Sequence, residues 1–309
     1  MIQLEGLTKH YGQVRAVEDL TFTVEPGVVT GFLGPNGAGK STTMRMILGL
    51  DNPTSGTALI DGRPFRDFRR PLKQVGALLD AKAVHPNRSA ANHLKWMAQT
   101  NGISSRRVDE VLGLVGLSDV AGKKAGGFSL GMGQRLGLAG ALLGDPRVLI
   151  LDEPVNGLDP EGIRWVRGLL KALAAEGRTI LISSHLLSEM ALTADRLVVI
   201  GRGRLVADTT THQFIREHSA AVVQVRTERQ EDFAARLAEL GFASTTSTDP
   251  DGRPVLEVPN RSTDEIGALA FSEGFAVREL ALRQASLEDA FMDSTTDSVQ
   301  YQASGQEAQ

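Results

Sequence analysis

The eight residues from Gly34 to Ser41, GPNGAGKS, have the spacing of a phosphate-binding loop. In the pattern G-x-x-x-x-G-K-[ST], backbone N–H groups surround the phosphates, the lysine contacts the β- and γ-phosphates, and the hydroxyl ligates Mg²⁺. We expect Gly34, Gly37 and Gly39 to adopt positive φ angles that turn their N–H groups towards one anion. The loop therefore predicts a bound nucleotide with Mg²⁺, contacted by Lys40 and Ser41.

Two elements must position this loop. Val28–Leu33 is an apolar, β-branched run that predicts a buried strand, and Thr42–Leu50 has the apolar spacing of a helix. A helix that begins near Lys40 adds about half a positive charge at its N-terminus, where the phosphates would bind. The predicted nucleotide contacts of the loop are Gly34, Pro35, Asn36, Gly37, Ala38, Gly39, Lys40, Ser41 and Thr42.

One aromatic residue, Tyr11, lies upstream of the loop in KHYGQ, between two predicted strands. Its ring can be ordinary half-buried packing, or it can stack on adenine, because stacking requires only a π face. Both interpretations stay open, and Tyr11 is included among the candidate nucleotide contacts.

Two further buried strands end in titratable side chains. VLILDEP (Val148–Pro154) ends in Asp152 and Glu153, and TILISSH (Thr179–His185) ends in an imidazole. Asp152 is predicted to hold Mg²⁺, and Glu153, one residue nearer the γ-phosphate, to polarise a water molecule. The alternative is that the two acids merely cap a helix, but a phosphate-binding loop in the same chain favours the chemical interpretation.

The remaining pattern predicts an α/β chain with two domains. The larger, residues 1–215, combines antiparallel strands, buried strands and helices, with a helical insertion at about 85–145. The smaller, residues 216–292, is a predicted α+β module, and the polar residues 293–309 are expected to be disordered. The elements expected in the smaller module are strands at 221–226, 254–258 and 276–282, helices at 230–240 and 263–272, and capping boxes at Ser262–Glu265 and Ser286–Asp289.

Composition excludes several classes of function. The net charge of −4 and the pI near 5.9 argue against a surface that binds nucleic acid. The absence of cysteine excludes disulfides, thiolate metal sites and thiol catalysis. The start of the chain does not resemble a signal peptide, and no apolar run approaches about 18 residues, so we expect any role at a membrane to depend on a partner.

Two more segments complete a recognisable series. FSLGM (Phe128–Met132) is followed by GQRLGLA, and NGLD (Asn156–Asp159) follows the acidic pair. In this order, residues 1–215 resemble the ATP-binding subunit of an ABC transporter: GPNGAGKST is similar to the Walker A loop, FSLGM to the signature, LILDEP to Walker B and NGLD to the D-loop. The resemblance implies a P-loop NTPase fold of the ABC type, with a RecA-like core, an antiparallel β subdomain and a helical subdomain.

The family resemblance also implies roles for individual residues. Two copies would sandwich ATP head to tail, so that the signature of one copy meets the nucleotide of the other. The implied catalytic residues are Lys40, Glu153 as general base and His185 as the switch histidine. The implied signature contacts are Ser129, Leu130, Gly131 and Met132, Asp159 would communicate between the two sites, and Ser41 and Asp152 would hold Mg²⁺.

The signature and the ending ASLEDAF (Ala285–Phe291) are similar to those of the drug-resistance ATPases of the daunorubicin-resistance type. That class implies export of a drug-like or amphipathic compound through a separately encoded permease, with the ATPase bound peripherally at the cytoplasmic face of the cell membrane. Leu130 and Met132 depart from the general ABC signature but occur in this class. Asp80 stands where the family has its Q-loop glutamine; it is either a further Mg²⁺ ligand or a surface residue that faces only the permease.

Three alternative functions fit the sequence less well. A soluble ABC ATPase that acts on ribosomes or DNA would have two such domains or long coiled coils, and this acidic chain has one phosphate loop and no long heptad segment. The same loop also occurs in kinases and GTPases, but guanine recognition usually needs an N-K-x-D segment, which the sequence lacks. An inactive nucleotide-sensing scaffold is disfavoured because Lys40, Asp152, Glu153 and His185 are all present.

Overall fold

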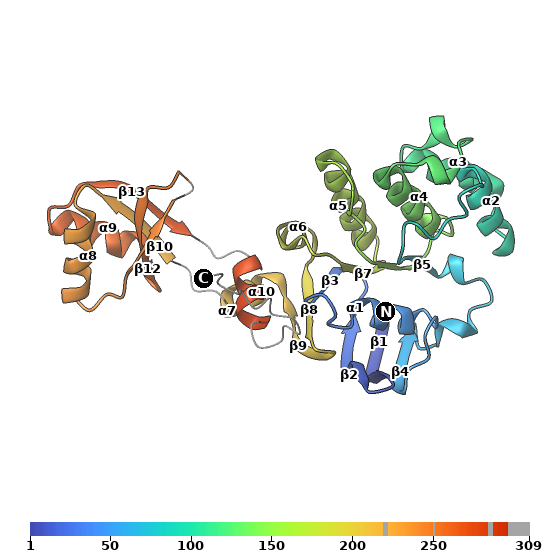
Figure 1. Cartoon of the computed structure of the whole chain (residues 1–309), viewed down its shortest axis with the longest axis horizontal. Helices are drawn as coiled ribbons and strands as arrows, with labels where there is room; N and C mark the ends of the chain where they lie inside the picture. The colour runs from blue at the N-terminus through green and yellow to red at the C-terminus, as the bar shows by residue number, and fades with distance from the viewer. Residues whose placement is uncertain (219–221, 250, 284–286, 296–309) are drawn as a thin grey trace, which may run out of the picture. The chain divides into compact units, whose positions relative to one another are not determined.

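The chain divides between Thr211 and His212 into two units. Figure 1 shows the computed structural model, which describes residues 1–218, 222–249, 251–283 and 287–295. The division precedes the expected boundary at 215/216, because helix α7 (Thr211–His218) begins one residue before the second unit and runs across that boundary. The tail predicted to be disordered begins at 293, but residues 293–295 form the end of helix α10 (Leu287–Thr295), and the rest of the tail lies outside the described residues.

A six-stranded sheet forms the centre of the first unit, in the order β5-β6-β7-β3-β8-β9. All neighbours are parallel except β9, which is antiparallel to β8 at the edge. Every residue of β3, β6 and β7 is buried, which explains their unbroken apolar sequences. The strands are β3 (Val29–Leu33), β5 (Val75–Leu78), β6 (Val148–Leu151), β7 (Thr179–Ser183), β8 (Arg196–Gly201) and β9 (Arg204–Thr210).

A second, antiparallel sheet packs into the same hydrophobic core. It has the order β2-β1-β4 and consists of β1 (Ile2–Tyr11), β2 (Val14–Val24) and β4 (Ser55–Ile60). Its alternating apolar side chains join residues of the six-stranded sheet and of helix α1 (Lys40–Ile47) in one buried cluster, in which the rings of Phe22 and Phe32 are 5.5 Å apart. This packing fixes α1, and with it the end of the phosphate loop.

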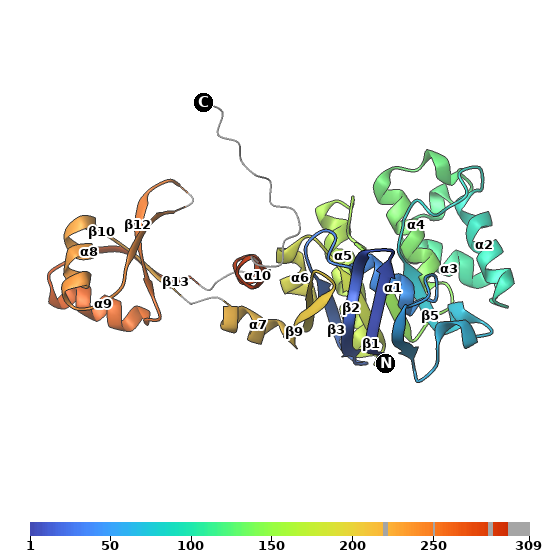
Figure 2. The ribbon, with the colours of Figure 1, turned by 60° about the horizontal axis from the view of Figure 1, so that its bottom comes forward.

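Three helices, α2, α3 and α4, lie within the segment predicted as a helical insertion. Figures 1 and 2 show α2, α3 and α4 gathered together at one side of the first unit. Serine side chains cap all three helices, and the second begins after Ser104, whose hydroxyl accepts a hydrogen bond from the Arg106 N–H. The helices of the first unit beyond α1 are α2 (Ala90–Thr100), α3 (Ser105–Leu114), α4 (Leu130–Leu142), α5 (Pro160–Ala175) and α6 (Leu187–Thr193).

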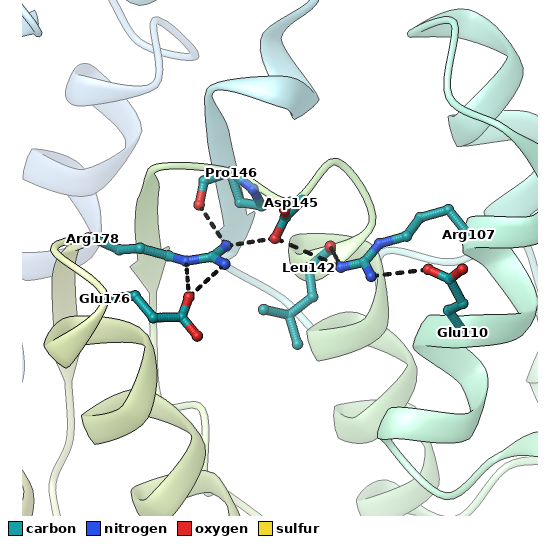
Figure 3. Close-up of polar contacts among 7 residues, drawn as sticks. All are labelled: Arg107, Glu110, Leu142, Asp145, Pro146, Glu176 and Arg178. Carbon is teal, nitrogen blue, oxygen red and sulfur yellow. Dashed lines mark hydrogen bonds and ion pairs between the residues drawn. The ribbon is translucent and has the colours of Figure 1, made fainter.

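Asp145 ties the end of α4 to the turn before β7 (Figure 3). The Arg178 guanidinium donates to its carboxylate at 2.7 Å and to the Pro146 carbonyl at 3.1 Å, and Arg107 of α3 approaches the same carboxylate at 3.8 Å. Exposed ion pairs add little stability on their own. The hydrogen bonds from Arg178 and Arg107 to the backbone carbonyls of Pro146 and Leu142 therefore contribute most to the stability of this region. The network fixes the loop that leads into β6, the strand that precedes Asp152.

The second unit is an α+β module with its own hydrophobic core. Its four-stranded antiparallel sheet has the order β11-β12-β10-β13, and helices α8 and α9 cover one face of it. The predicted cap at Ser262 is confirmed, and the capping box predicted at Ser286 lies outside the described residues. The elements are α7, β10 (Val222–Thr227), α8 (Gln230–Glu239), β11 (Thr245–Thr248), β12 (Pro254–Pro259), α9 (Thr263–Ser272), β13 (Val277–Arg283) and α10 (Leu287–Thr295).

Two of these elements, α7 and β11, were not predicted, and the start of α10 was predicted only through the capping box at Ser286–Asp289. Strand β11 has the sequence TTST, which contains no apolar alternation, and only its pairing with β12 defines it as a strand. Across the described ranges, no helix combines the length and apolarity that a membrane span requires.

Candidate active site

The phosphate loop joins the end of β3 to the start of α1. Gly37 and Gly39 have positive φ angles of 81° and 103°, as predicted. A Cβ at Gly39 would also lie 2.4 Å from the Ala16 carbonyl oxygen. The prediction for Gly34 is wrong, because its φ is not positive; a side chain is excluded there because a Cβ would lie 2.5 Å from the Ile200 carbonyl oxygen.

Lys40, the first residue of α1, folds back over the loop. Its ammonium donates hydrogen bonds to the carbonyl oxygens of Gly34 and Pro35. Burial lowers the pKa of this ammonium, and the negative charges of Glu153 and Asp152 oppose that shift. A cavity of about 320 Å³ beside it is lined by Ala16, Asn36, Gly37, Ala38, Gly39, Lys40, Ser41, Thr42, Asp152 and Glu153. The sequence-predicted cradle and both acids of Walker B thus come together at one helix N-terminus.

Ser41 and Asp152 form the candidate metal site. The Ser41 hydroxyl donates to the Asp152 carboxylate at 2.7 Å, although the two residues belong to different elements. Hydroxyl and carboxylate oxygens are the hard ligands that Mg²⁺ prefers in nucleotide sites, where water and phosphate oxygens supply the rest. The residues present therefore fit Mg²⁺, even though no cluster of three acidic or histidine side chains occurs among the described residues.

Glu153 is held on three sides. Its backbone N–H donates to the Ser183 hydroxyl at 3.0 Å, its carbonyl accepts from the Gln134 side-chain amide at 2.7 Å, and its carboxylate lies 2.6 Å from His185 Nδ1. Its φ of 51° is left-handed, a conformation that costs a non-glycine residue about 1 kcal/mol or more. The two backbone hydrogen bonds compensate this strain, so the carboxylate has a defined direction towards the imidazole.

Sequence analysis missed the two residues that hold Glu153. Ser183 is fully buried at the end of β7, where its hydroxyl also donates a short hydrogen bond to the second carboxylate oxygen of Asp152. Gln134 is buried in α4, the helix that follows the signature. A signal existed for both, because a buried polar side chain in an otherwise apolar strand or helix must find a partner.

Removal of the Ser183 hydroxyl tests this support. We expect Ser183→Ala to lower kcat for ATP hydrolysis about tenfold while KM for ATP stays nearly unchanged, because a buried N–H left unpaired costs about 1–3 kcal/mol. Steady-state ATPase kinetics measure both constants.

Thr30→Val in the neighbouring strand β3 is the matched control. The Thr30 hydroxyl is also buried but has no hydrogen-bond partner. We therefore expect its loss to leave kcat unchanged, and equal losses of kcat in the two variants would contradict the positioning role of Ser183.

The signature residues lie at the start of α4, away from the residues that line the cradle of the same chain. Ser129 caps the helix, its hydroxyl accepting from the Met132 N–H at 3.3 Å. Leu130 packs against Gly157, and a Cβ at Gly131 would lie 2.9 Å from the Gly157 carbonyl oxygen. The signature thus contacts the loop that contains Asp159.

Asp159 has a structural role in this chain. Its carboxylate caps α5, accepting from the Gly162 N–H at 2.9 Å, and pairs with Arg135 of α4 at 3.9 Å. Because the Asp159 side chain links α4, which follows the signature, to α5, which follows the acidic pair, a shift of either helix would displace the other.

Comparisons with known proteins agree with this geometry. Residues 17–156 match the family described as ABC transporter, and residues 221–288 match one described as a domain of unknown function (DUF8746). The uncharacterized ABC transporter ATP-binding protein YhcH of Bacillus subtilis is 38% identical over 299 residues, which cover 96% of each chain. The chain belongs to the ATP-binding subunits of ABC transporters. The predicted family and fold are therefore confirmed.

Two further similarities support the membership. The bacitracin transport ATP-binding protein BcrA of Bacillus licheniformis is 45% identical over 211 residues, 67% of this chain and 69% of that one. A solved structure described as the ATP-binding subunit of an ABC transporter is 30% identical, with a TM-score of 0.65 over 70% of this chain and 92% of that chain. This ABC ATPase therefore binds and hydrolyses ATP, and it has the P-loop NTPase fold of the ABC type.

Tyr11 of the ABC ATPase is held beside the first helix. Its hydroxyl donates to the Asp51 carboxylate at 3.0 Å, and about half of the side chain is exposed. Desolvation raises the pKa of this phenol, and the hydrogen bond to Asp51 is the next largest cause of the increase. The tether fixes the hydroxyl, and the Lys9 ammonium lies over the ring, 4.9 Å from its centroid, so adenine stacking stays a prediction.

Asp80 is exposed just after β5 and has a local partner. Its carboxylate accepts from the Lys82 N–H at 2.7 Å. Within the described part of the chain, no hydrogen bond or ion pair joins it to Ser41 or Asp152, and it lines a different cavity, with Trp96 of α2. Its role as a further metal ligand stays a prediction that this geometry does not favour.

A magnesium titration separates the two interpretations of Asp80. We expect Asp80→Gln to leave the Mg²⁺ concentration for half-maximal ATPase activity within about twofold, as for other exposed substitutions. Any effect of the substitution on the ATPase rate would then appear in its stimulation by the expected permease. A several-fold increase in the Mg²⁺ requirement would instead identify Asp80 as a ligand, and identical ATPase rates and transport would remove any functional role.

Proposed function

We propose that this ABC ATPase works as a homodimer on a separately encoded permease and energises export of an amphipathic compound of the peptide-antibiotic class. The observation that carries the ATPase mechanism is the contact between Glu153 and His185, 2.6 Å apart beside the phosphate cradle. The substrate class is supported by the name of BcrA, a bacitracin transport ATP-binding protein, and by the lantibiotic transport ATP-binding protein SrtF of Streptococcus pyogenes, which is 38% identical over 208 residues.

In the proposed mechanism, Glu153 accepts the proton of a water molecule that attacks the γ-phosphate, while the bond from the γ-phosphorus to the bridging β-phosphate oxygen breaks and ADP leaves. His185 orients the carboxylate and contacts the γ-phosphate, so that water and phosphate stay aligned. Lys40 and the N–H groups of the loop offset the negative charge of the phosphates. Bound Mg²⁺, held by Ser41 and Asp152, supplies further positive charge to the phosphate oxygens.

The location of the signature supports the proposed dimer. Ser129 and Gly131 stand at a helix N-terminus, where an anion is favoured, yet neither lines the cradle of its own chain. A second copy placed head to tail would bring this N-terminus to the γ-phosphate. Closure on ATP and opening after hydrolysis would then drive the permease between two accessibilities at the cytoplasmic face of the cell membrane.

A drug-susceptibility assay tests the export proposal. Disruption of the chain in its host is expected to lower the inhibitory concentration of bacitracin-like peptides several-fold, and the wild-type chain but not Glu153→Gln should restore it. An unchanged inhibitory concentration across a panel of amphipathic antibiotics would contradict drug export while leaving the ATPase chemistry in place. In the alternative, a soluble ATPase on ribosomes or DNA, the disruption would affect translation or repair instead.

A further inference from the structure

The two edges of the accessory sheet differ in length and composition. At one edge, β11 (Thr245–Thr248) has four residues, all threonine or serine. At the other, β13 (Val277–Arg283) has seven residues and, among the described strands, pairs only with β10. An edge strand presents a row of unpaired N–H and C=O groups that can pair with another strand. Because β13 is the longer and more apolar edge strand, it is the better template for pairing with a strand of another chain.

The register with β10 defines both faces of β13. Leu280 and Leu282 lie opposite Val225 and Val223, on the face that the helices cover. Leu280 packs against the core, but Leu282 is 47% exposed. The buried face of the module is therefore incomplete at this edge.

The opposite face of β13 carries charges of both signs. Glu279, Ala281 and Arg283 alternate along it, and all three are exposed. Glu279 pairs with Arg226 at 3.0 Å, and Arg283 approaches Glu257 at 3.5 Å. A carboxylate has about four acceptor positions and a guanidinium five donors, so each keeps capacity for another partner.

This sequence is complementary to itself in one antiparallel register. When two copies of β13 are related by a two-fold axis at Ala281, Glu279 of each copy lies opposite Arg283 of the other. In the same register, Leu280 lies opposite Leu282, which covers the exposed leucine. A shift that centres the axis on Glu279 would place two carboxylates face to face, and like charges directly opposite are destabilising.

We propose that β13 pairs with β13 of a second copy of this chain and joins the two accessory sheets into one continuous sheet. The contact is isologous, as two-fold dimers require. The proposal rests on the homodimer of the proposed function, and it adds a joint that does not depend on nucleotide. Two ATPase units tethered in this way would meet at a millimolar effective concentration in every cycle, instead of separating after hydrolysis.

The absence of cysteine makes a direct test possible. Residues opposite each other in antiparallel strands have Cα atoms about 4.5–5.5 Å apart, within the range that a disulfide spans. We expect the full-length Ala281→Cys variant, oxidised without nucleotide, to become a covalent dimer on a non-reducing gel. Thr245→Cys, exposed on the other edge of the same sheet, is the matched control and should stay monomeric.

A mixture of two other variants tests the register. Glu279→Cys and Arg283→Cys, on chains of different length, should cross-link to each other and not to themselves, because each self-pair is offset by about 13 Å. Self-pairs as abundant as the mixed pair would overturn the proposed register.

The outcomes separate this joint from the proposed function. Failure of Ala281→Cys to cross-link, or cross-linking no faster than in Thr245→Cys, would overturn the β13 joint. If the β13 joint fails this test but the Glu153→Gln variant still dimerises with ATP, the proposed ATP sandwich is intact. Conversely, efficient cross-linking at residue 281 with no ATP-dependent dimer of Glu153→Gln would support the joint and contradict the sandwich.

Discussion

Glu153→Gln is expected to lower kcat for ATP hydrolysis by about 10²–10⁴-fold, the usual contribution of a general base, while ATP affinity stays within about twofold. The amide has the shape of the carboxylate but cannot accept the proton. Both backbone hydrogen bonds of residue 153, to Ser183 and Gln134, are independent of its side chain, so the left-handed conformation is retained. Single-turnover hydrolysis and equilibrium nucleotide titration measure the two quantities.

A double-mutant comparison tests whether Glu153 and His185 act as a unit. His185→Ala alone should also lower kcat, and adding it to Glu153→Gln should cause little further loss, because residues that serve one step are not additive. Glu25→Gln, an exposed acid after β2, is the control and should hydrolyse ATP normally. Hydrolysis by Glu153→Gln at the wild-type rate would eliminate Glu153 as the base.

Lys40→Ala is expected to weaken ATP binding about 10–100-fold, since a hydrogen bond to a charged group contributes about 1.5–3 kcal/mol. The ammonium is already directed towards the loop carbonyls of Gly34 and Pro35, and its loss removes the cation that is predicted to offset the phosphate charge. Calorimetric titration with ATP measures the affinity, and far-ultraviolet circular dichroism confirms that α1 remains folded.

Lys171→Ala is the matched control for Lys40→Ala. Lys171 is an exposed lysine of another helix, α5, so its removal changes the net charge equally without touching the cradle. Equal ATP affinities in the two variants would contradict the assignment of Lys40 to the phosphates.

The cradle was predictable because its chemistry is local in sequence. Gly37, Gly39 and Lys40 follow a buried strand and precede a helix, so the strand-loop-helix pattern alone indicates where the anion binds. The acidic pair was predictable for a related reason, because Asp152 and Glu153 end an apolar strand, and strand ends of a parallel sheet meet at one edge.

The side chains that hold the acidic pair could not be identified from the sequence, because their contacts depend on pairing between segments that are distant in the chain. Ser183 reaches Asp152 and Glu153 only because β7 lies beside β6, and Gln134 reaches Glu153 only through the packing of α4. The left-handed φ of Glu153 is likewise invisible in a sequence, since it is imposed by these partners. Gly34 shows the same limit, because the atom that excludes its side chain belongs to Ile200.

Affinity purification of the tagged chain from detergent-solubilised native membranes tests the central claim most directly. We expect a polytopic permease to copurify in a stoichiometric amount with the wild-type chain, with Glu153→Gln and with Lys40→Ala, because both substitutions lie inside the nucleotide cradle. Mass spectrometry of the purified complex identifies that partner. Ribosomal proteins or DNA in its place, with no membrane protein, would contradict the transport function and leave only the ATPase chemistry.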